Sequence, residues 1–335
     1  MFRYLRKLIL SLKVRRRKPP PDDGENIRPP EDPSGDELSE KLSENITRIR
    51  SIFGSSPDLV VREFNIGRCP GHRAALILIE GVTNTDLINT NILKPLMFDF
   101  IENAGEAEGS TGTIDIEDIF NNFVPACNTK KVFEISELAE NITKGYTALI
   151  IDGLTVALSV GAKKWEARAV TEPTTETVIR GPHTGFTESL GDNVALLRRV
   201  INNPSLRFEQ MKIGRYTKTD VLIAYIDGIV NPPIIDEVKK RLNDIDIDGV
   251  LDSGYIEAYI QDSPYSVFNT VGNTERPDVV SSRLLEGRVA IMADGSPFAL
   301  TVPMLFIENF QAPADYYRKF NHSSFVRILR YIAFA

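Results

Sequence analysis

A chain of 335 residues is longer than one hydrophobic core usually supports, so its length favours about two domains. Hydrophobic residues make up 42% and charged residues 25%, a composition that excludes a disordered, collagen-like or coiled-coil body. Cys69 and Cys127 are too few for a disulfide framework and lie in no zinc-ligand spacing, which indicates reduced thiols.

The N-terminus is a basic arm, although the whole chain carries a net charge of -7. Residues 1–18 hold eight Lys or Arg and no acid, with apolar side chains between them, a pattern that suits an anionic membrane surface. A solvated tail is the alternative, and the acidic body argues against nucleic acid. The cations expected at the lipid surface are Arg15, Arg16, Arg17 and Lys18.

The folded body is predicted to begin after a linker. Residues 19–37 are rich in proline, glycine and acids and cannot bury enough apolar surface to fold. A stripe of apolar residues at helical spacing then follows at Leu38, Leu42, Ile46, Ile49 and Phe53. Ser34 or Asp36 is expected to cap this helix, and Gly54 to end it.

The rest of the first half alternates between strand and helix patterns. Apolar runs predict strands at 58–66 and 74–81, the second buried on both faces. A helix is expected from Thr85, and a shorter one from Ser136 to Gly145. A hairpin is predicted at 147–160, with a further strand at 164–172.

The second half repeats this order. "IIDGLTVALSV" (Ile150–Val160) returns as "IMADGSPFALTV" (Ile291–Val302), and Asp-Gly between apolar runs predicts a tight primed turn with two positive φ angles. Helices are expected at 232–245, where Asn231 is the cap, and at 253–261 and 277–285. The prediction is two related α/β subdomains, each a small mixed sheet with flanking helices and an Asp-Gly hairpin, joined by a linker.

The C-terminus turns apolar after a group of cations. Arg327 and Arg330 precede the last apolar residues, as at the cytosolic border of a membrane helix, although no run reaches the roughly 18 apolar residues that a span needs. The expected boundaries are 1–37 for arm and linker, 38–180 and 181–320 for the subdomains, and 321–335 for a helix leading to a membrane region. A terminal helix docked on the body is the alternative.

No catalytic or metal-binding pattern emerges from the sequence. His183 lies near no nucleophile signature, and a phosphate-binding loop is absent. The acidic loop 243–254 resembles a calcium loop but has Tyr255 where the final acid is required. Arg180, Arg198 and Arg199 offer positive charge for an acidic partner, with a solvated helix face as the alternative.

Several motifs resemble the A subunit of the GerA family of bacterial spore germinant receptors. They are "IRGPHTGFTESLGDNVALLRRVI", "YIDGIVNPPIIDEVKKRL", "RPDVVSSRLLEGRVAIMADGSPFALTVP" and "ADYY". Together they place the resemblance over roughly Leu38 to the C-terminus. The positions marked as candidate interface residues are Arg180, Gly181, Pro182, Gly185, Phe186, Thr187, Glu188, Arg198, Arg276, Pro277 and Asp278.

The resemblance implies a cytosolic domain followed by a membrane region in the spore inner membrane. It implies B and C subunits as partners, a homo-oligomer of A subunits, and a response to a nutrient that ends in ion release. No cofactor, metal or nucleic acid is expected. We therefore predict a non-enzymatic assembly and signalling domain; the alternative is a module that binds a small nutrient between the two subdomains.

Overall fold

The computed structural model describes residues 36–67, 72–99, 128–163, 173, 176, 180–262, 266, 268–312, 315, 317 and 319–334. The basic arm with Arg15, Arg16, Arg17 and Lys18, most of the linker, and the predicted strand at 164–172 lie outside these residues.

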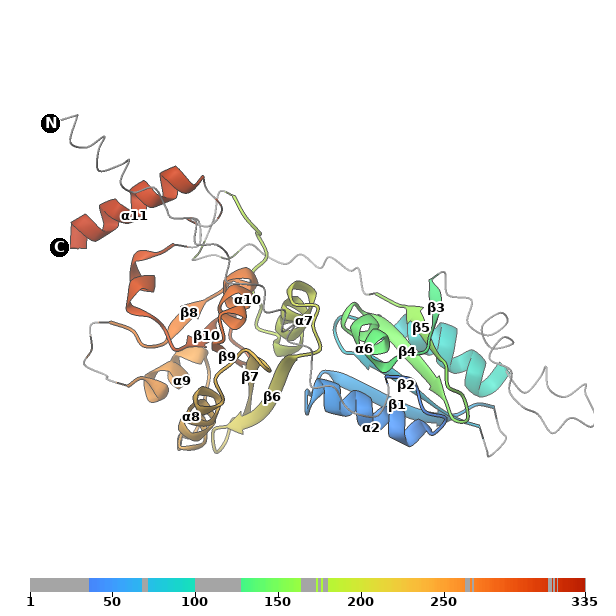
Figure 1. The fold of residues 1–335 in the computed structure, drawn as a ribbon. Coiled ribbons are helices and arrows are strands. Elements are labelled where there is room, and N and C mark those ends of the chain that lie inside the picture. The colour runs from blue at the N-terminus through green and yellow to red at the C-terminus, as the bar shows by residue number, and fades with distance from the viewer. Residues whose placement is uncertain are drawn as a thin grey trace, which may run out of the picture. The chain divides into compact units, whose positions relative to one another are not determined.

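Two five-stranded sheets have the same topology (Figure 1). The first has the order β1 (Leu59–Asn65), β2 (Arg73–Ile79), β4 (Tyr146–Ile151), β5 (Ala157–Gly161) and β3 (Thr129–Val132). The second has the order β6 (Leu206–Ile213), β7 (Thr219–Ile226), β9 (Val289–Ala293), β10 (Ala299–Val302) and β8 (Gly272–Thr274). The predicted α/β fold with two related subdomains is confirmed. The described strand pairs are antiparallel, whereas mixed sheets were expected.

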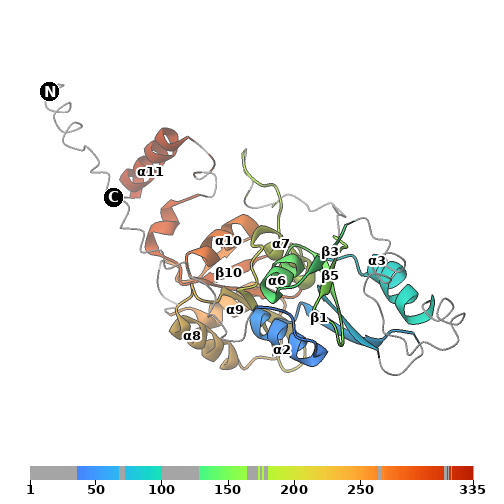
Figure 2. The ribbon, with the colours of Figure 1, turned by 45° about the vertical axis from the view of Figure 1, so that its right-hand side comes forward.

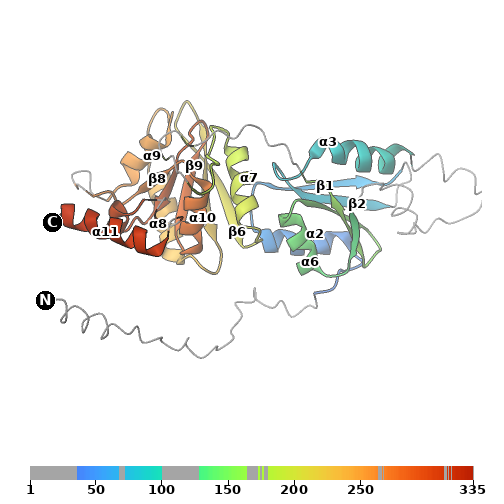
Figure 3. The same ribbon diagram turned by 90° about the horizontal axis from the view of Figure 1, so that it is seen from above.

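Helices cover both faces of the first sheet. Helices α2 (Leu42–Phe53) and α6 (Ile135–Thr143) pack on one face, and α3 (Thr85–Ile88), continued by the π-helical turns η1 (Asn89–Leu93) and η2 (Pro95–Asp99), packs on the other (Figure 3). This explains why β2 is apolar along its length, since side chains on both of its faces are buried.

The second sheet is covered in the same way. Helices α7 (Leu190–Val200) and α10 (Pro277–Leu285), adjacent in Figure 2, pack on one face. Helices α8 (Pro232–Asn243) and α9 (Ser253–Ile260) pack on the other. Proline stands in the first turn of α8 and of α10, where its missing N–H would have no intrahelical partner in any case.

Buried asparagines show how closely the two subdomains repeat. Asn45 donates to the Ser39 carbonyl at 2.6 Å and accepts from the Ser39 N–H at 2.9 Å. Asn193 makes the same pair of bonds with Thr187, at 2.6 and 2.8 Å. Each amide therefore ties the segment before the first helix of its subdomain to that helix.

The Asp-Gly hairpins have a different geometry from the one predicted. Gly153 and Gly295 have φ angles of +86° and +84°, whereas neither aspartate before them has a positive φ, so the primed turn was wrong. Each aspartate instead accepts from the first helical N–H of its subdomain, Asp152 from Leu42 at 2.8 Å and Asp294 from Leu190 at 3.3 Å. The hairpin loop thus supplies a carboxylate to a helix N-terminus distant in sequence.

Several predicted helix caps also differ. Helix α2 begins at Leu42 with Lys41 as its N-cap residue, and Asp36 instead accepts from the Ser136 N–H at 3.1 Å. Ser189, rather than Thr187, caps α7. These corrections share one cause: the asparagine and aspartate contacts above already hold the residues that precede each helix.

A short tail follows the second sheet. It consists of the 3-10 helix η4 (Phe306–Phe310) and the helix α11 (Phe320–Phe334), so the helix expected at 321–335 is present. Among the described residues, none of the helices has both the length and the apolarity required to cross a bilayer.

Candidate functional site

A buried ion pair links α7 to the first subdomain. Arg198 Nε lies 2.7 Å from Asp58 Oδ2 and its Nη2 lies 3.2 Å from Oδ1, with both side chains almost fully buried. The guanidinium carbon lies 4.9 Å from the centre of the Phe208 ring and 5.9 Å from that of Phe53. Arg198 is therefore neither solvated nor open to a carboxylate ligand, since Asp58 already occupies it.

The same face of α7 makes a close backbone contact. Gly81 has a φ of +78°, and a Cβ placed there would lie 3.0 Å from the Ala195 side chain. Phe208, on β6, also donates its N–H to the hydroxyl of Ser56 at 3.1 Å. The junction between the subdomains thus combines an ion pair, a glycine contact and a strand-edge hydrogen bond.

The family-like motifs converge around Arg276 at the start of α10. Its fully buried guanidinium donates to the carbonyls of Glu176 at 3.3 Å and Pro182 at 3.1 Å, and to Asp278 Oδ2 at 2.8 Å. Tyr317, from the "ADYY" motif, donates its hydroxyl to the same carboxylate oxygen. Three motifs separate in sequence therefore share one buried arginine–aspartate pair, which we call the Arg276 cluster.

Tyr317 covers the backbone at Gly181. The φ of Gly181 is +137°, and a Cβ there would lie 2.9 Å from the Tyr317 ring, so glycine is required on both counts. Burial, and then the hydrogen bond to Asp278, raise the pKa of Tyr317 to about 12.

The raised pKa predicts a loss of stability in alkaline solution. An unfolded tyrosine titrates near pH 10. The stabilisation that depends on the protonated Tyr317 is therefore complete below about pH 10 and is lost as the pH rises toward 12. Urea unfolding between these pH values should show a steeper decline for the parent chain than for Tyr317→Phe. The exposed Tyr216→Phe should decline like the parent, and equal slopes for all three chains would contradict the assignment.

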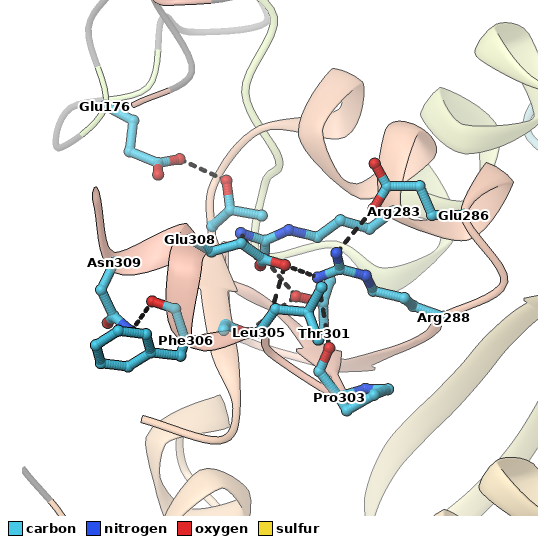
Figure 4. A network of polar contacts seen from close by, with 12 residues as sticks. Glu176, Arg283, Glu286, Arg288, Thr301, Pro303, Leu305, Phe306, Glu308 and Asn309 are labelled. Atoms are coloured by element: carbon cyan, nitrogen blue, oxygen red, sulfur yellow. Dashed lines mark hydrogen bonds and ion pairs between the residues drawn. The ribbon is translucent and has the colours of Figure 1, made fainter. Parts of the chain in front are cut away.

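A second polar cluster holds η4 against the second sheet (Figure 4). Glu308 forms ion pairs with Arg288 and, at 3.5 Å, with Arg283. Arg283 also donates to the hydroxyl of Thr301 on β10, and burial lowers the pKa of its guanidinium below the usual range. We call Glu308 with its two arginines the Glu308 clamp.

Helix α11 is tied to the end of η4. Arg330 donates to the Phe310 carbonyl at 3.1 Å and to Asp315, and Tyr331 packs on the Phe310 ring at 5.2 Å between ring centres. Burial raises the pKa of Asp315, but its hydrogen bonds from Arg330 and neighbouring groups outweigh that effect and hold the pKa below its ordinary value. The expected alternative of a terminal helix contacting the body thus has structural support.

The predicted interface residues fall into three settings. Arg276, Pro277, Asp278, Gly181 and Pro182 belong to the Arg276 cluster or lie next to it. Phe186, Gly185 and Thr187 are structural: Phe186 is buried and donates its N–H to the Glu275 carbonyl, Gly185 is buried beside it, and Thr187 holds Asn193. Arg180 and Glu188 are exposed.

Sequence reasoning missed the partners of these residues. Asp58, Glu308 and Arg283 carried no motif of their own, and Tyr317 was noted as part of a motif without a role. A signal was available for Asp58, because an acid immediately before a strand that starts at Leu59 is well placed to meet a helix packed at that end of the sheet.

The chemistry of these clusters is structural. Within the described ranges, no group of three or more His, Cys, Asp or Glu side chains is placed to hold a metal ion. The calcium-like loop places Asp246 against Arg215, at 2.7 Å from Nε. Two hollows of about 260 Å³ lie beside α8 and α9, and the residues that line them all belong to the second half of the chain.

Fold and contacts together define a duplicated α/β domain whose units and tail are joined by buried ionic contacts. The sequence profile of a family described as "Bacillus/Clostridium GerA spore germination protein" matches residues 47–335. Spore germination protein KA of Bacillus subtilis (strain 168) is 39% identical over 297 residues, which are 89% of this chain and 53% of that protein. Spore germination protein B1 of the same organism is 34% identical over 295 residues, 88% of this chain and 59% of that protein.

A solved structure agrees with these relatives. The crystal structure of the N-terminal domain of the A subunit of the Bacillus megaterium spore germinant receptor GerK3 is 40% identical, with a TM-score of 0.64. The match covers 81% of this chain and 97% of that domain. The chain belongs to the GerA family of spore germination proteins. It spans little more than half the length of the curated relatives.

Proposed function

We propose that this chain is the N-terminal domain of a germinant receptor A subunit that takes part in receptor assembly and in transmitting the nutrient signal toward ion release, without enzymatic activity. The remainder of the receptor protein would be a membrane region, with this domain on the cytosolic side of the spore inner membrane. B and C subunits and further A subunits would be its partners. The subdomain boundaries proposed for it are 38–180 and 181–320, after an arm and linker at 1–37 and before a terminal helix at 321–335.

The observation that carries this proposal is a continuous series of buried ionic contacts. The Arg198–Asp58 pair joins the subdomains, and the Glu308 clamp joins the second sheet to η4. Arg330 then joins η4 to α11. Because paired buried charges resist separation, a displacement of one element is passed to the next rather than absorbed locally.

The alternative function, a small nutrient bound between the subdomains, has less support. Arg198 would be the natural partner of a nutrient carboxylate there, but its guanidinium is bound by Asp58 and stacked between two aromatic rings. The described hollows are lined by residues of α8, α9 and their neighbours instead.

The coupling proposal is tested by weakening the Glu308 clamp in the complete receptor. Glu308→Gln keeps the size of the side chain but removes the charge that pairs with Arg283 and Arg288. Spores that carry this variant should contain a normal amount of receptor by immunoblotting, yet release ions at least tenfold more slowly at saturating nutrient.

Glu286→Gln is the matched control. Glu286 contacts the same Arg288, at 2.8 Å, but it is about half-exposed and makes no described contact with η4. It should release ions like the parent. Normal ion release by Glu308→Gln at parental receptor levels would contradict the coupling role.

A further inference from the structure

Helix α11 turns its apolar side away from the body. Its exposed apolar residues recur at positions i, i+3, i+4 and i+7, which places them on one face. They are Phe325, Ile328, Leu329 and Ile332, with exposed fractions of 61%, 54%, 47% and 67%. A helix at the surface of a protein in water usually has the opposite arrangement, with its apolar stripe against the core.

The face of α11 toward the body is polar. Ser323 is buried and donates to the Asp315 carbonyl at 2.7 Å, and Arg327 and Arg330 pair with the Asp315 carboxylate. Along the helix these three side chains lie opposite the apolar stripe. Their contacts fix the rotation of α11, so the stripe cannot turn inward without breaking the ion pairs.

The charges of this segment suit an anionic surface. Residues 316–335 contain Arg318, Lys319, Arg327 and Arg330 and no acidic residue, although the chain as a whole has a net charge of -7. A helix of fifteen residues is about 22 Å long at 1.5 Å per residue, which is shorter than the roughly 30 Å of a bilayer core. An amphipathic helix with cationic flanks is instead typical of a helix that lies in the plane of the membrane interface.

The apolar surface continues beyond α11. Leu305, Phe306 and Ile307, where η4 begins, are 52%, 53% and 47% exposed. Phe306 packs edge-on against Phe310, and Phe310 contacts Tyr331 of α11, so both apolar segments are anchored through one aromatic group. Two separate apolar projections favour a lipid surface over the single continuous seam of a partner helix.

We propose that α11 lies flat on an anionic lipid surface, with its stripe Phe325, Ile328, Leu329 and Ile332 inserted among the acyl chains. The assignment is independent of the signalling role proposed above, because it concerns α11 of this chain whether or not the Glu308 clamp transmits a signal. It also differs from a membrane span, since the helix remains attached to η4 along its polar face.

Vesicle flotation of the 335-residue chain tests the proposal. The probe is a vesicle of phosphatidylcholine with phosphatidylglycerol, compared with phosphatidylcholine alone. The chain should carry the triple change Arg15→Glu, Arg16→Glu and Arg17→Glu, so that the basic arm does not anchor it. In this background, Ile328→Glu with Ile332→Glu should reduce partitioning onto the anionic vesicles at least tenfold.

Leu285→Glu is the matched control, because Leu285 is similarly exposed, at 58%, at the end of α10. It should bind like its background, and circular dichroism should show that all variants are folded. Unchanged partitioning after the double α11 change would overturn the proposal. So would light scattering that shows a dimer dissolved by the α11 change in a chain that binds no vesicles, because the stripe would then be an interface between copies.

Discussion

Replacing Asp58 with alanine is expected to lower the free energy of unfolding by about 3–5 kcal/mol, the loss typical of breaking a buried ion pair. Arg198 would remain as an uncompensated charge between two aromatic rings, at a site with almost no access to water. Such a loss is a large fraction of the 5–15 kcal/mol that usually stabilises a protein. Urea unfolding followed by circular dichroism measures it directly.

Replacing both members of the pair separates the charge from the packing. Asp58→Leu combined with Arg198→Met removes the buried charges and keeps apolar volume against Phe53 and Phe208, so much of the lost stability should return. As a control for ion pairs in general, Asp246→Ala breaks the pair with Arg215, which is exposed on both sides and should change the midpoint little. A small effect for Asp58→Ala as well would contradict the buried junction.

Replacing Arg276 with leucine is the second change with a large expected effect, about 2–4 kcal/mol, because it leaves buried acceptors without their donor. The carbonyls of Glu176 and Pro182 lose their hydrogen bonds, and Asp278 keeps Tyr317 as its described side-chain partner. The segment that starts at Arg180 should also become more accessible. Limited proteolysis should therefore cut it at least tenfold faster than in the parent, while urea unfolding reports the global loss.

Arg180→Leu is the informative comparison, because the sequence presents Arg180 and Arg276 as similar motif arginines. Arg180 is exposed, so its replacement should leave both stability and the cleavage rate close to those of the parent. If the two variants behaved alike, the Arg276 cluster would not hold the segment, and the placement of Tyr317 over Gly181 would need another explanation.

Periodicity and repetition predicted most of the fold. The apolar stripe through Ile46 and Ile49, the buried run of β2 and the Asp-Gly repeat identified helices, a central strand and the duplication, because such patterns depend on burial over one or two turns of chain. The family resemblance, made from several separate motifs, was confirmed by the family match and the solved relative. The hairpin geometry was predicted wrongly, since the role of Asp152 depends on a helix more than a hundred residues earlier.

What sequence alone determined, then, is the order of helices and strands, the duplication, and the residues that make up the motifs. What the tertiary structure decided is which charges meet. Nothing local distinguishes Arg198, which is fully buried against Asp58, from Arg199 beside it, which is exposed. The reason is physical: a helix places successive residues about 100° apart around its axis, and only the packing of α7 on the first subdomain determines which of the two faces it.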